Sequence, residues 1–402
     1  MAHILVIGGG QAGASLVAKL RTEGFDGEIT LLCDEPVPPY QRPPLSKAYL
    51  LGEMEEARLY LRPEAFYAEH GIDLRLGVRA ETVDPEAKTV TAGGETIGYD
   101  QLALVTGSIP RRLPAAIGGA LESVYTVRTL ADVDAMAPEF GEGRRVLIVG
   151  GGYIGLEAAA VAAKRGLEVT LVEMSDRILK RVAAPVTSDW FRALHRAHGV
   201  DVREGVGLER LHGDTRVTGA RLSDGTELDL DFVVVGIGIA PASALAEAAG
   251  IACEDGILVD DHGRTSAPGV WAAGDCARLP FRSGRIRLES VQNAIDQAEV
   301  VARNMLGADE AYVPQPWFWS DQYDVHLQIA GLNMGYDTVV VRPGEGAARS
   351  HWYYAGDRLL AVDAMNDARA YMVGKRLLER GTSPDREVVA DPATNLKALL
   401  KS

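Results

Sequence analysis

Two short apolar runs along the chain each lead into a glycine-rich turn and then into a stretch with helical spacing of apolar residues. The first run, 4–7, precedes the turn at 8–13, and the second run, 146–149, precedes the turn at 150–155. A run of apolar residues that is followed by glycines and then by a period of about 3.6 is typical of a β-strand that passes into an α-helix. We therefore predict a strand–turn–helix unit at each place.

Both units continue in the same order. A second strand is predicted at 28–32 in the first unit and at 168–172 in the second, and the apolar runs 100–107 and 232–236 predict the closing strands. The closing strands run into similar turns that contain glycine, isoleucine and proline. This similarity indicates that the second unit is inserted into the first, which resumes near residue 240.

The last part of the chain has a different pattern. From about residue 320, apolar and polar residues alternate as in strands, and a helical segment at 367–379 and a polar tail follow. We predict an α/β fold with two Rossmann-like dinucleotide-binding domains, the second inserted in the first, and a small C-terminal α+β domain. The predicted bounds are 1–108 with 240–318 for an FAD-binding domain, 109–239 for an NAD-binding domain and 319–402 for the C-terminal domain.

Composition narrows the classes of function. The 402 residues are 47% apolar, which is enough for several full cores. The 41 basic and 56 acidic residues give a net charge of −15, which argues against a nucleic-acid partner or an anionic membrane surface. No apolar stretch approaches the roughly 20 residues that a membrane span needs. We expect a cytoplasmic protein that binds neither nucleic acid nor membrane.

Cysteine and histidine spacing gives little support for a metal or a disulfide. Cys33, Cys253 and Cys276 are scattered and form no Cys-x-x-Cys pair, so we expect neither a disulfide framework nor electron transfer through a cysteine pair. The spacing of His195 and His198 could suit a metal ion, but no third ligand is near and their segment has the pattern of a solvated helix face. We therefore predict no metal site.

The glycines of the two turns carry the predicted chemistry. The spacing Gly-x-Gly-x-x-Gly is formed by Gly8, Gly10 and Gly13 and again by Gly150, Gly152 and Gly155. Glycines at these positions allow a tight turn and let backbone N–H groups approach a pyrophosphate at the helix N-terminus. One match is weak evidence, but two at strand–helix junctions predict two dinucleotides. A flavin with a nicotinamide is the most economical pair, and it points to hydride transfer.

An acidic residue follows the second strand of each unit. Asp34, with Glu35 beside it, ends the strand in the first unit, and Glu173 ends the strand in the second. A carboxylate at this place accepts hydrogen bonds from the adenosine ribose and repels a 2′-phosphate. We therefore predict a preference for NADH over NADPH. Arg177, four residues after Glu173, is the one feature that could weaken this preference.

Four further strings complete the pattern. They are Arg42-Pro43-Pro44-Leu45-Ser46-Lys47, the string 265–275 that ends in Gly274-Asp275, Glu289-Ser290-Val291-Gln292-Asn293-Ala294, and Phe318-Trp319-Ser320-Asp321-Gln322. Together with the two glycine turns, they resemble the oxygenase-coupled, NADH-dependent ferredoxin reductases over essentially the whole chain. The first and the last string distinguish this family from the disulfide reductases.

The resemblance implies an FAD enzyme that takes a hydride from NADH at flavin N5. It would then pass the electrons singly to a [2Fe-2S] ferredoxin that serves a cytochrome P450 or a ring-hydroxylating dioxygenase. The residues that the resemblance places at FAD, besides the first glycine triplet and Asp34, are Ala12, Pro44, Lys47, Val78, Arg128, Asp275 and Val291. Those that it places at NAD, besides the second glycine triplet, are Ile154 and Glu173.

Three residues are implied to be catalytic. Lys47 would lie near the reactive edge of the flavin, and Glu157 would face the nicotinamide and approach Lys47 when NADH binds. Trp319 would screen one side of the flavin. Each has an ordinary alternative: Lys47 as a surface lysine, Glu157 as a first-turn carboxylate favoured by the helix dipole, and Trp319 as a core aromatic residue.

The sequence determines the electron acceptor less well than the cofactors. A related flavoprotein that reduces rubredoxin, a quinone or dioxygen remains open, as does an NADH-binding flavoprotein that acts as a redox sensor. For a ferredoxin, which is acidic like this chain, docking needs a local basic patch. Arg282, Arg285 and Arg287 are the candidate residues for this patch.

Overall fold

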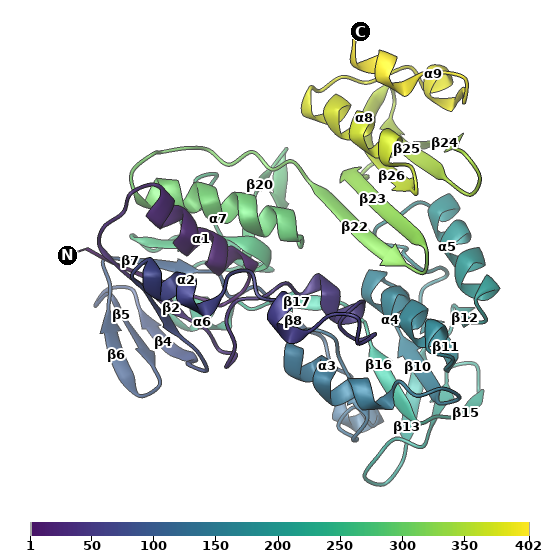
Figure 1. Cartoon of the computed structure of the whole chain (residues 1–402), viewed down its shortest axis with the longest axis horizontal. Helices are drawn as coiled ribbons and strands as arrows, with labels where there is room; N and C mark the ends of the chain where they lie inside the picture. Colours follow the sequence, from purple (N-terminus) through teal and green to yellow (C-terminus); the bar gives the residue numbers. More distant parts are fainter. Residues whose placement is uncertain (1, 402) are drawn as a thin grey trace. The chain divides into compact units, whose positions relative to one another are not determined.

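The computed structural model describes residues 2–401, which form two compact units (Figure 1). The first unit contains residues 2–42, Glu55–Ile109 and Ile239–Gln315. The second contains Pro43–Met54, Pro110–Gly238 and residues 316–401. Within these residues, no helix is both long and apolar enough to cross a membrane.

The first unit is built on a parallel sheet of five strands in the order β19-β7-β1-β2-β3. Its strands are β1 (His3–Ile7), β2 (Glu28–Leu32), β3 (Ile72–Arg75), β7 (Gln101–Leu104) and β19 (Val270–Ala272). Side chains of β1 alternate between the two faces. Ile4 and Val6 join one core cluster, whereas Leu5 and Ile7 join another. The sheet is therefore buried on both faces, as the continuous apolar run predicts.

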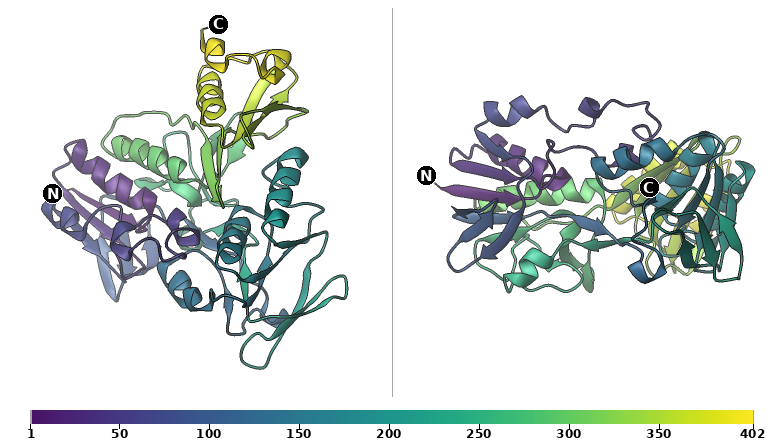
Figure 2. Two further views of the ribbon diagram at one scale, coloured as in Figure 1. Left: turned by 45° about the vertical axis from the view of Figure 1, so that its right-hand side comes forward. Right: turned by 90° about the horizontal axis from the view of Figure 1, so that it is seen from below.

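Different layers cover the two faces. Helices α1 (Gln11–Thr22) and α7 (Val291–Met305) lie side by side on the face of Ile4 and Val6 (Figures 1 and 2). A three-stranded antiparallel sheet covers the other face. It consists of β4 (Ala80–Asp84), β5 (Thr89–Ala92) and β6 (Glu95–Gly98).

Short elements complete the first unit. They are α2 (Glu64–Glu69), β17 (Ile239–Pro241), α6 (Ala244–Ala248), β18 (Ile257–Leu258), β20 (Ala277–Phe281) and β21 (Gly284–Ile286). Strand β17 pairs with β8 (Ser108–Pro110). The two similar turns singled out in the sequence therefore lie next to each other, where the chain leaves the first unit and returns to it.

The second unit repeats the plan with a parallel sheet in the order β12-β11-β10-β16-β9. Its strands are β9 (Val124–Tyr125), β10 (Arg145–Val149), β11 (Glu168–Glu173), β12 (Asp201–Glu204) and β16 (Phe232–Val235). Its helices are α3 (Leu130–Met136), α4 (Tyr153–Lys164) and α5 (Pro185–Ala197). An antiparallel sheet of β13 (Leu208–His212), β14 (Gly219–Leu222) and β15 (Glu227–Asp229) packs against it through a shared apolar core.

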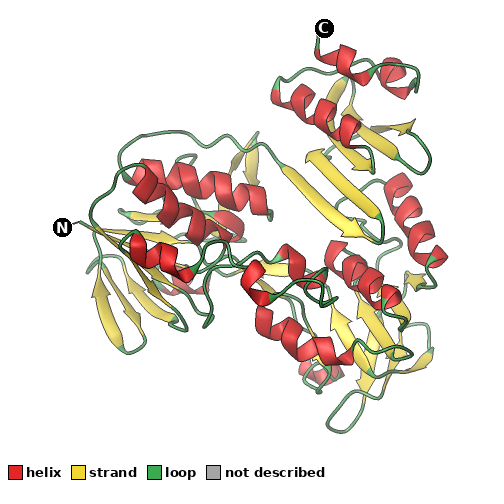
Figure 3. Cartoon of the chain, viewed as in Figure 1, coloured by secondary structure: helices red, strands yellow, loops and turns green. Residues whose placement is uncertain are grey.

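The C-terminal part of the second unit is an antiparallel sheet in the order β22-β23-β26-β25-β24 with short helices (Figure 3). Its elements are β22 (Trp317–Gln322), β23 (Val325–Gly331), β24 (Thr338–Pro343), β25 (Arg349–Ala355), β26 (Arg358–Met365), α8 (Ala368–Glu379) and α9 (Arg386–Ala390). Tyr353, Leu360 and Ala361 of this sheet form a buried cluster with Ala184, next to α5.

The predicted fold class is confirmed: two Rossmann-like units, the second inserted in the first, precede a C-terminal α+β part. The compact units do not follow the predicted domain bounds at every point, because Pro43–Met54 packs with the second unit. The division into an FAD-binding and an NAD-binding domain stays a prediction.

One interpretation of the helix around His195 is wrong. His195 is 0% exposed, so it does not lie on the solvated face of its segment, to which Ala193 and Arg196 belong. Helix α5 turns Phe191 and His195, one helical turn apart, toward the interior, whereas Arg196 and His198, which directly follows the helix, are exposed. A polar residue at an apolar position of the helical period was the signal for burial.

A buried polar cluster also joins α5 to the C-terminal sheet. Thr187 donates to the carboxylate of Asp363 over 3.1 Å and lies 2.7 Å from His351 Nδ1. Tyr353 donates to the same carboxylate. Burial raises the pKa of Asp363 to about 7, and the two hydrogen bonds oppose this shift.

We predict that Asp363 makes the protein less stable as pH rises. Because its pKa is raised in the folded state from 3.8 to about 7, its contribution is complete below about pH 4 and is lost as pH rises through 7. The free energy of unfolding should therefore fall by about 4 kcal/mol over this range, and Asp363→Asn should remove this decline. Urea unfolding of the two proteins across the range tests this. The exposed Asp357→Asn variant should keep the decline, and a decline that persists in Asp363→Asn would refute the assignment.

Candidate functional site

In the first glycine turn, two of the three glycines are required by close packing. A Cβ on Gly8, whose φ is +128°, would lie 2.2 Å from the carbonyl oxygen of Val105. A Cβ on Gly13 would lie 2.0 Å from the carbonyl oxygen of Gly8. A Cβ on Gly10, by contrast, would meet no atom within 4 Å. The middle glycine therefore leaves the backbone open to an incoming group, and it does so at the N-terminus of α1.

The second turn repeats this geometry. A Cβ on Gly150, with φ of +108°, would lie 2.4 Å from the Gly236 oxygen, and one on Gly155 would lie 2.0 Å from the Gly150 oxygen. Gly152 again faces open space. Neither Gly10 nor Gly152 caps its helix through a side chain, so the first N–H groups of α1 and α4 stay available to an anion. Both turns therefore fit a dinucleotide pyrophosphate.

The acid after the second turn is held by the backbone. Glu173 accepts hydrogen bonds from the N–H of Gly151 over 2.8 Å and from the N–H of Ser175 over 2.7 Å, one on each carboxylate oxygen. The guanidinium of Arg177 donates instead to Ser188 over 2.6 Å and to the carbonyl of Lys180 over 3.2 Å. A fixed negative charge therefore stands beside the turn, and Arg177 is engaged elsewhere.

The acids after β2 differ from each other. Glu35 accepts a hydrogen bond from Tyr40 over 2.5 Å and pairs with Arg42 at 2.6 Å. The side chain of Asp34 is 66% exposed and lies 3.7 Å from Arg79. Asp34 is thus the acid that remains accessible next to the first turn.

The second unit holds a further buried carboxylate, that of Glu157, in the second turn of α4. Glu157 is only 3% exposed. Lys47 Nζ lies 3.1 Å from its Oε1, and Ser320 donates to the same oxygen over 2.7 Å. Ser46 donates to Oε2 over 2.7 Å. Segments far apart in sequence thus surround one buried anion with three donors.

Lys47 is held from two sides. Its side chain is 17% exposed and, besides Glu157, it lies 3.6 Å from Asp321 Oδ2. Its ammonium also lies 5.9 Å from the ring centre of Trp319. Burial raises the pKa of Glu157, and Lys47 and the two serine hydroxyls oppose this rise. A half-buried, paired lysine and a carboxylate beyond the first helical turn both differ from the ordinary alternatives considered above.

The other candidate residues fall into one set in each unit. In the first unit, Ala12 lies in α1 and Val291 begins α7, while Asp275 accepts a hydrogen bond from Ser108 over 2.9 Å. Val78 follows β3 and donates its N–H to the Cys33 oxygen over 2.8 Å.

The second unit holds Pro44, Lys47, Arg128, Ile154, Glu157 and Trp319. Pro44 and Ser46 lie in one 3₁₀ turn directly before Lys47. Ile154 lies in the first turn of α4 and is 43% exposed. The N–H of Arg128 donates to Asp132, in the capping box of α3. Nothing in these contacts tests the binding roles that the sequence assigns.

Sequence reasoning missed Ser46 and Ser320 as partners of Glu157, and it missed Gln322 and His195 behind them. The signal was present, because Ser46 and Ser320 belong to the first and the last of the four strings that carry the family resemblance. Alternation along β22 also places Ser320 and Gln322 on one face of that strand.

The arginine cluster proposed for docking is not a uniform basic patch. The side chain of Arg287 is 11% exposed and pairs with Asp255 at 3.3 Å and Glu289 at 2.7 Å. Arg285 donates to the carbonyl of Val259 over 2.6 Å. The positive charges of Arg285 and Arg287 are therefore partly directed into the protein, which weakens the cluster as a docking surface.

Among the described residues, the cysteines form no disulfide. Cys33 and Cys276 are buried and Cys253 is half-buried. Burial raises the pKa of the Cys33 thiol to about 12, so it stays protonated.

Comparison with known proteins gives a consistent result over the whole chain. Residues 2–298 match the family described as pyridine nucleotide-disulphide oxidoreductase, and residues 317–400 match the family described as reductase C-terminal. The 5,5'-dehydrodivanillate O-demethylase ferredoxin reductase subunit of a Sphingobium species is 45% identical over 98% of this chain and 97% of its own length. Putidaredoxin reductase of Pseudomonas putida is 37% identical over 99% of this chain and 96% of its own.

A solved structure agrees with the sequence relatives. The covalent putidaredoxin reductase–putidaredoxin complex contains a chain that matches with a TM-score of 0.96 and 37% identity. The match covers 100% of this chain and 98% of that chain.

The two kinds of glycine in the second turn should respond differently to alanine. Gly152→Ala adds a methyl group in open space, so the fold should stay within about 0.5 kcal/mol of wild type while affinity for the dinucleotide falls about tenfold or more. Gly155→Ala would force a contact of 2.0 Å and should lower the free energy of unfolding by at least about 2 kcal/mol. Fluorescence titration and urea unfolding measure the two effects. Equal loss of stability in both variants would contradict the geometry.

Proposed function

Because the chain belongs to the ferredoxin reductases of oxygenase systems, we propose that it transfers electrons from NADH through bound FAD to a [2Fe-2S] ferredoxin. The ferredoxin would serve a cytochrome P450 or a ring-hydroxylating dioxygenase. The observation that carries the proposal is the Lys47–Glu157 pair, which two serines and a tryptophan surround beside the second glycine turn. When bound, the flavin accepts a hydride at N5 and releases the two electrons singly, which suits an iron–sulfur acceptor.

The residues of the first unit fit the adenosine and ribitol parts of FAD. The open backbone at Gly10, with Ala12 after it, would receive the pyrophosphate at the N-terminus of α1. The exposed carboxylate of Asp34 would accept hydrogen bonds from the ribose, with Val78 close to the adenine. Asp275 and Val291 would hold the ribitol and the ring.

The second unit provides the groups for NADH. Its turn would bind the pyrophosphate in the same way, with Ile154 in the first turn of α4, and Glu173 would accept hydrogen bonds from the adenosine ribose. The fixed negative charge of Glu173 disfavours a 2′-phosphate, which supports a preference for NADH.

Lys47 and Glu157 would act where charge changes during hydride transfer. The ammonium of Lys47 would favour negative charge at the reactive edge of the flavin, and its ion pair with Glu157 would hold it in place. Trp319, whose ring lies close to that ammonium, would screen one side of the flavin from water. Pro44 and Arg128 complete the proposed FAD contacts.

The proposed use of NADH and the state of the cysteines favour one cellular compartment. The enzyme would use NADH, which is supplied in the cytoplasm, and its described cysteines are free thiols rather than disulfides. We therefore propose a cytoplasmic location.

Anaerobic stopped-flow tests the proposed electron path. Mixing the FAD-loaded enzyme with NADH should bleach the flavin rapidly, and a second mix with a [2Fe-2S] ferredoxin should reduce the cluster rapidly. Rapid bleaching without transfer to any of several ferredoxins would favour rubredoxin, a quinone or dioxygen as acceptor. Slow bleaching with a long-lived NAD complex would favour the redox-sensor alternative.

The charge of Glu173 should set the choice of nicotinamide. We expect Glu173→Gln to lower the ratio of kcat/KM for NADH to that for NADPH by about tenfold or more, because repulsion of the 2′-phosphate is removed. Steady-state rates with both nucleotides measure this ratio. Asp176→Asn, which removes a nearby exposed charge outside the turn, serves as the control and should leave the ratio close to wild type. An unchanged ratio in Glu173→Gln would show that another residue selects NADH.

A further inference from the structure

A row of buried polar side chains continues from Glu157 toward the surface of the second unit. Strand β22 alternates, so that Ser320 and Gln322 face α4 and α5, whereas Trp319 and Asp321 approach Lys47. Ser320, Gln322 and His195 are all at most 1% exposed. None of them is among the residues that the sequence assigns to a dinucleotide.

Each of these residues is hydrogen-bonded to the next. Ser320 lies 2.7 Å from Glu157 Oε1, and Gln322 Nε2 lies 3.2 Å from Ser320 Oγ. His195 Nε2 lies 2.8 Å from Gln322 Oε1, and the hydroxyl of Tyr323 lies 3.0 Å from His195 Nδ1. Four hydrogen bonds thus connect Glu157 with Tyr323.

The direction of every bond follows from the first acceptor. Ser320 donates its single hydrogen to Glu157 and accepts a hydrogen bond from the amide nitrogen of Gln322. The amide oxygen of Gln322 then accepts from His195 Nε2–H, which leaves Nδ1 to accept from Tyr323. All four donors point toward Glu157.

The chemistry of the histidine agrees with this direction. Burial lowers the pKa of His195 to about 4, so the ring is neutral and carries one N–H. Burial also raises the pKa of Tyr323, so its hydroxyl keeps the proton that it donates.

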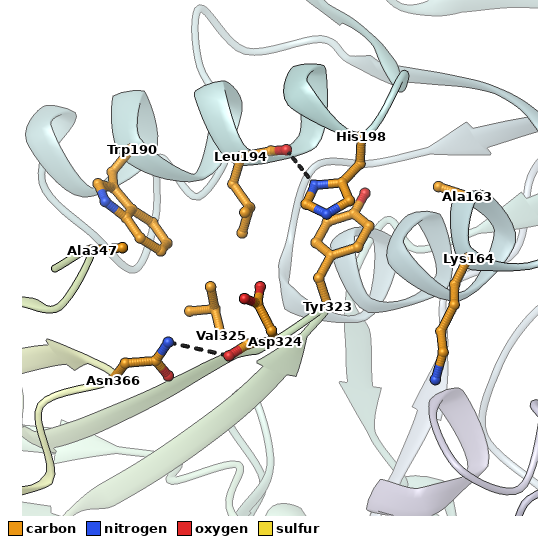
Figure 4. A pocket seen from close by; sticks show the side chains of 10 residues that line it. All are labelled: Ala163, Lys164, Trp190, Leu194, His198, Tyr323, Asp324, Val325, Ala347 and Asn366. Atoms are coloured by element: carbon orange, nitrogen blue, oxygen red, sulfur yellow. Dashed lines mark hydrogen bonds between the residues drawn. The ribbon is translucent and has the colours of Figure 1, made fainter.

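The outer end of the row is accessible. Tyr323 lies in the wall of a cavity of about 530 Å³, together with Trp190, Leu194 and Val325 (Figure 4). The ring of His198 stacks on Tyr323 with ring centres 3.7 Å apart. The row therefore reaches from a surface cavity to the ion pair.

We propose that Ser320, Gln322 and His195 are positioning residues that hold Glu157 ionised and oriented toward Lys47. Hydrogen bonds that point in one direction polarise one another in a medium of low dielectric constant, and they stabilise a buried anion more than a neutral acid. The inference rests on the proposed function, in which the Lys47–Glu157 pair serves hydride transfer.

Other groups also act on Glu157 and must be separated from the row. Three other groups face Glu157. The hydroxyl of Ser46 lies within the 3₁₀ turn, the ammonium of Lys47 directly follows that turn, and Tyr153 lies on the same helix as Glu157. Asp321 on β22 acts through Lys47. None of these is altered by a change at Ser320, Gln322 or His195.

Infrared titration of the FAD-loaded enzyme tests the proposal, with Glu157→Gln identifying the carboxyl band. In Ser320→Ala the protonation midpoint of Glu157 should rise by about one to two pH units, since a hydrogen bond to a charged group is lost. His195→Leu should raise it by less. His195→Gln, which keeps an N–H donor, should restore it to near wild type.

A matched control variant distinguishes a positioning role from a general loss of a buried hydroxyl in the C-terminal sheet. Ser350 is also a fully buried serine of the same sheet, and its hydroxyl accepts from Trp352 over 3.0 Å. Ser350→Ala should leave the Glu157 midpoint unchanged. If the midpoint stays at its wild-type value in folded Ser320→Ala and His195→Leu, or moves equally in Ser350→Ala, the proposal is wrong.

A kinetic comparison distinguishes failure of the positioning role from failure of the proposed function. The low-pH limb of flavin reduction by NADH should move upward in Ser320→Ala by the same shift as the infrared midpoint. If Glu157→Gln reduces flavin as fast as wild type, the role of the pair in hydride transfer fails, whereas the infrared midpoints still decide the positioning role.

Discussion

The buried carboxylate of Glu157 requires hydrogen-bond donors, and several segments of the second unit provide them. A negative charge removed from water is costly unless cations and donors replace the solvent. Glu157 obtains these from Lys47, Ser46 and Ser320, which reach it from the 3₁₀ turn and from β22. The packing of these segments on α4 is therefore coupled to the charge of a single residue. Loss of one partner would leave the others around an incompletely solvated anion.

The two glycine turns show how one backbone solution is used twice. In both, the first glycine packs on the closing strand and the third packs on the first, while the middle one leaves the surface open. The turns differ mainly in their acids. Glu173 is tied to its own turn by backbone hydrogen bonds, whereas Asp34 stands exposed while its neighbour Glu35 is engaged by Tyr40 and Arg42. Two turns with the same backbone geometry thus present different acidic side chains to their ligands.

Much of the fold was predictable because it depends on local patterns. The apolar runs at 4–7 and 146–149 and the glycines after them determine β1, β10 and the following helices, since a buried parallel strand leaves a continuous apolar run. The helical period places His195 on the same face of α5 as Phe191, but the residues that this face meets, Gln322 and Tyr323, lie far away in the sequence. Ser46 and Ser320 were missed as partners of Glu157 for the same reason. Spacing within one element shows which residues share a face, but not what that face meets.

The segment Pro43–Met54 gives the folding of this chain an unusual order. It packs with the second unit, although the residues on both sides of it belong to the first. Its Ser46 meets a glutamate 111 positions later, and that glutamate meets a serine a further 163 positions on. On a ribosome, this early segment must therefore wait through most of translation before β22 is made. The electrostatic centre of the enzyme is assembled last, so an incomplete chain carries the ammonium and the carboxylate without the strand that completes their environment.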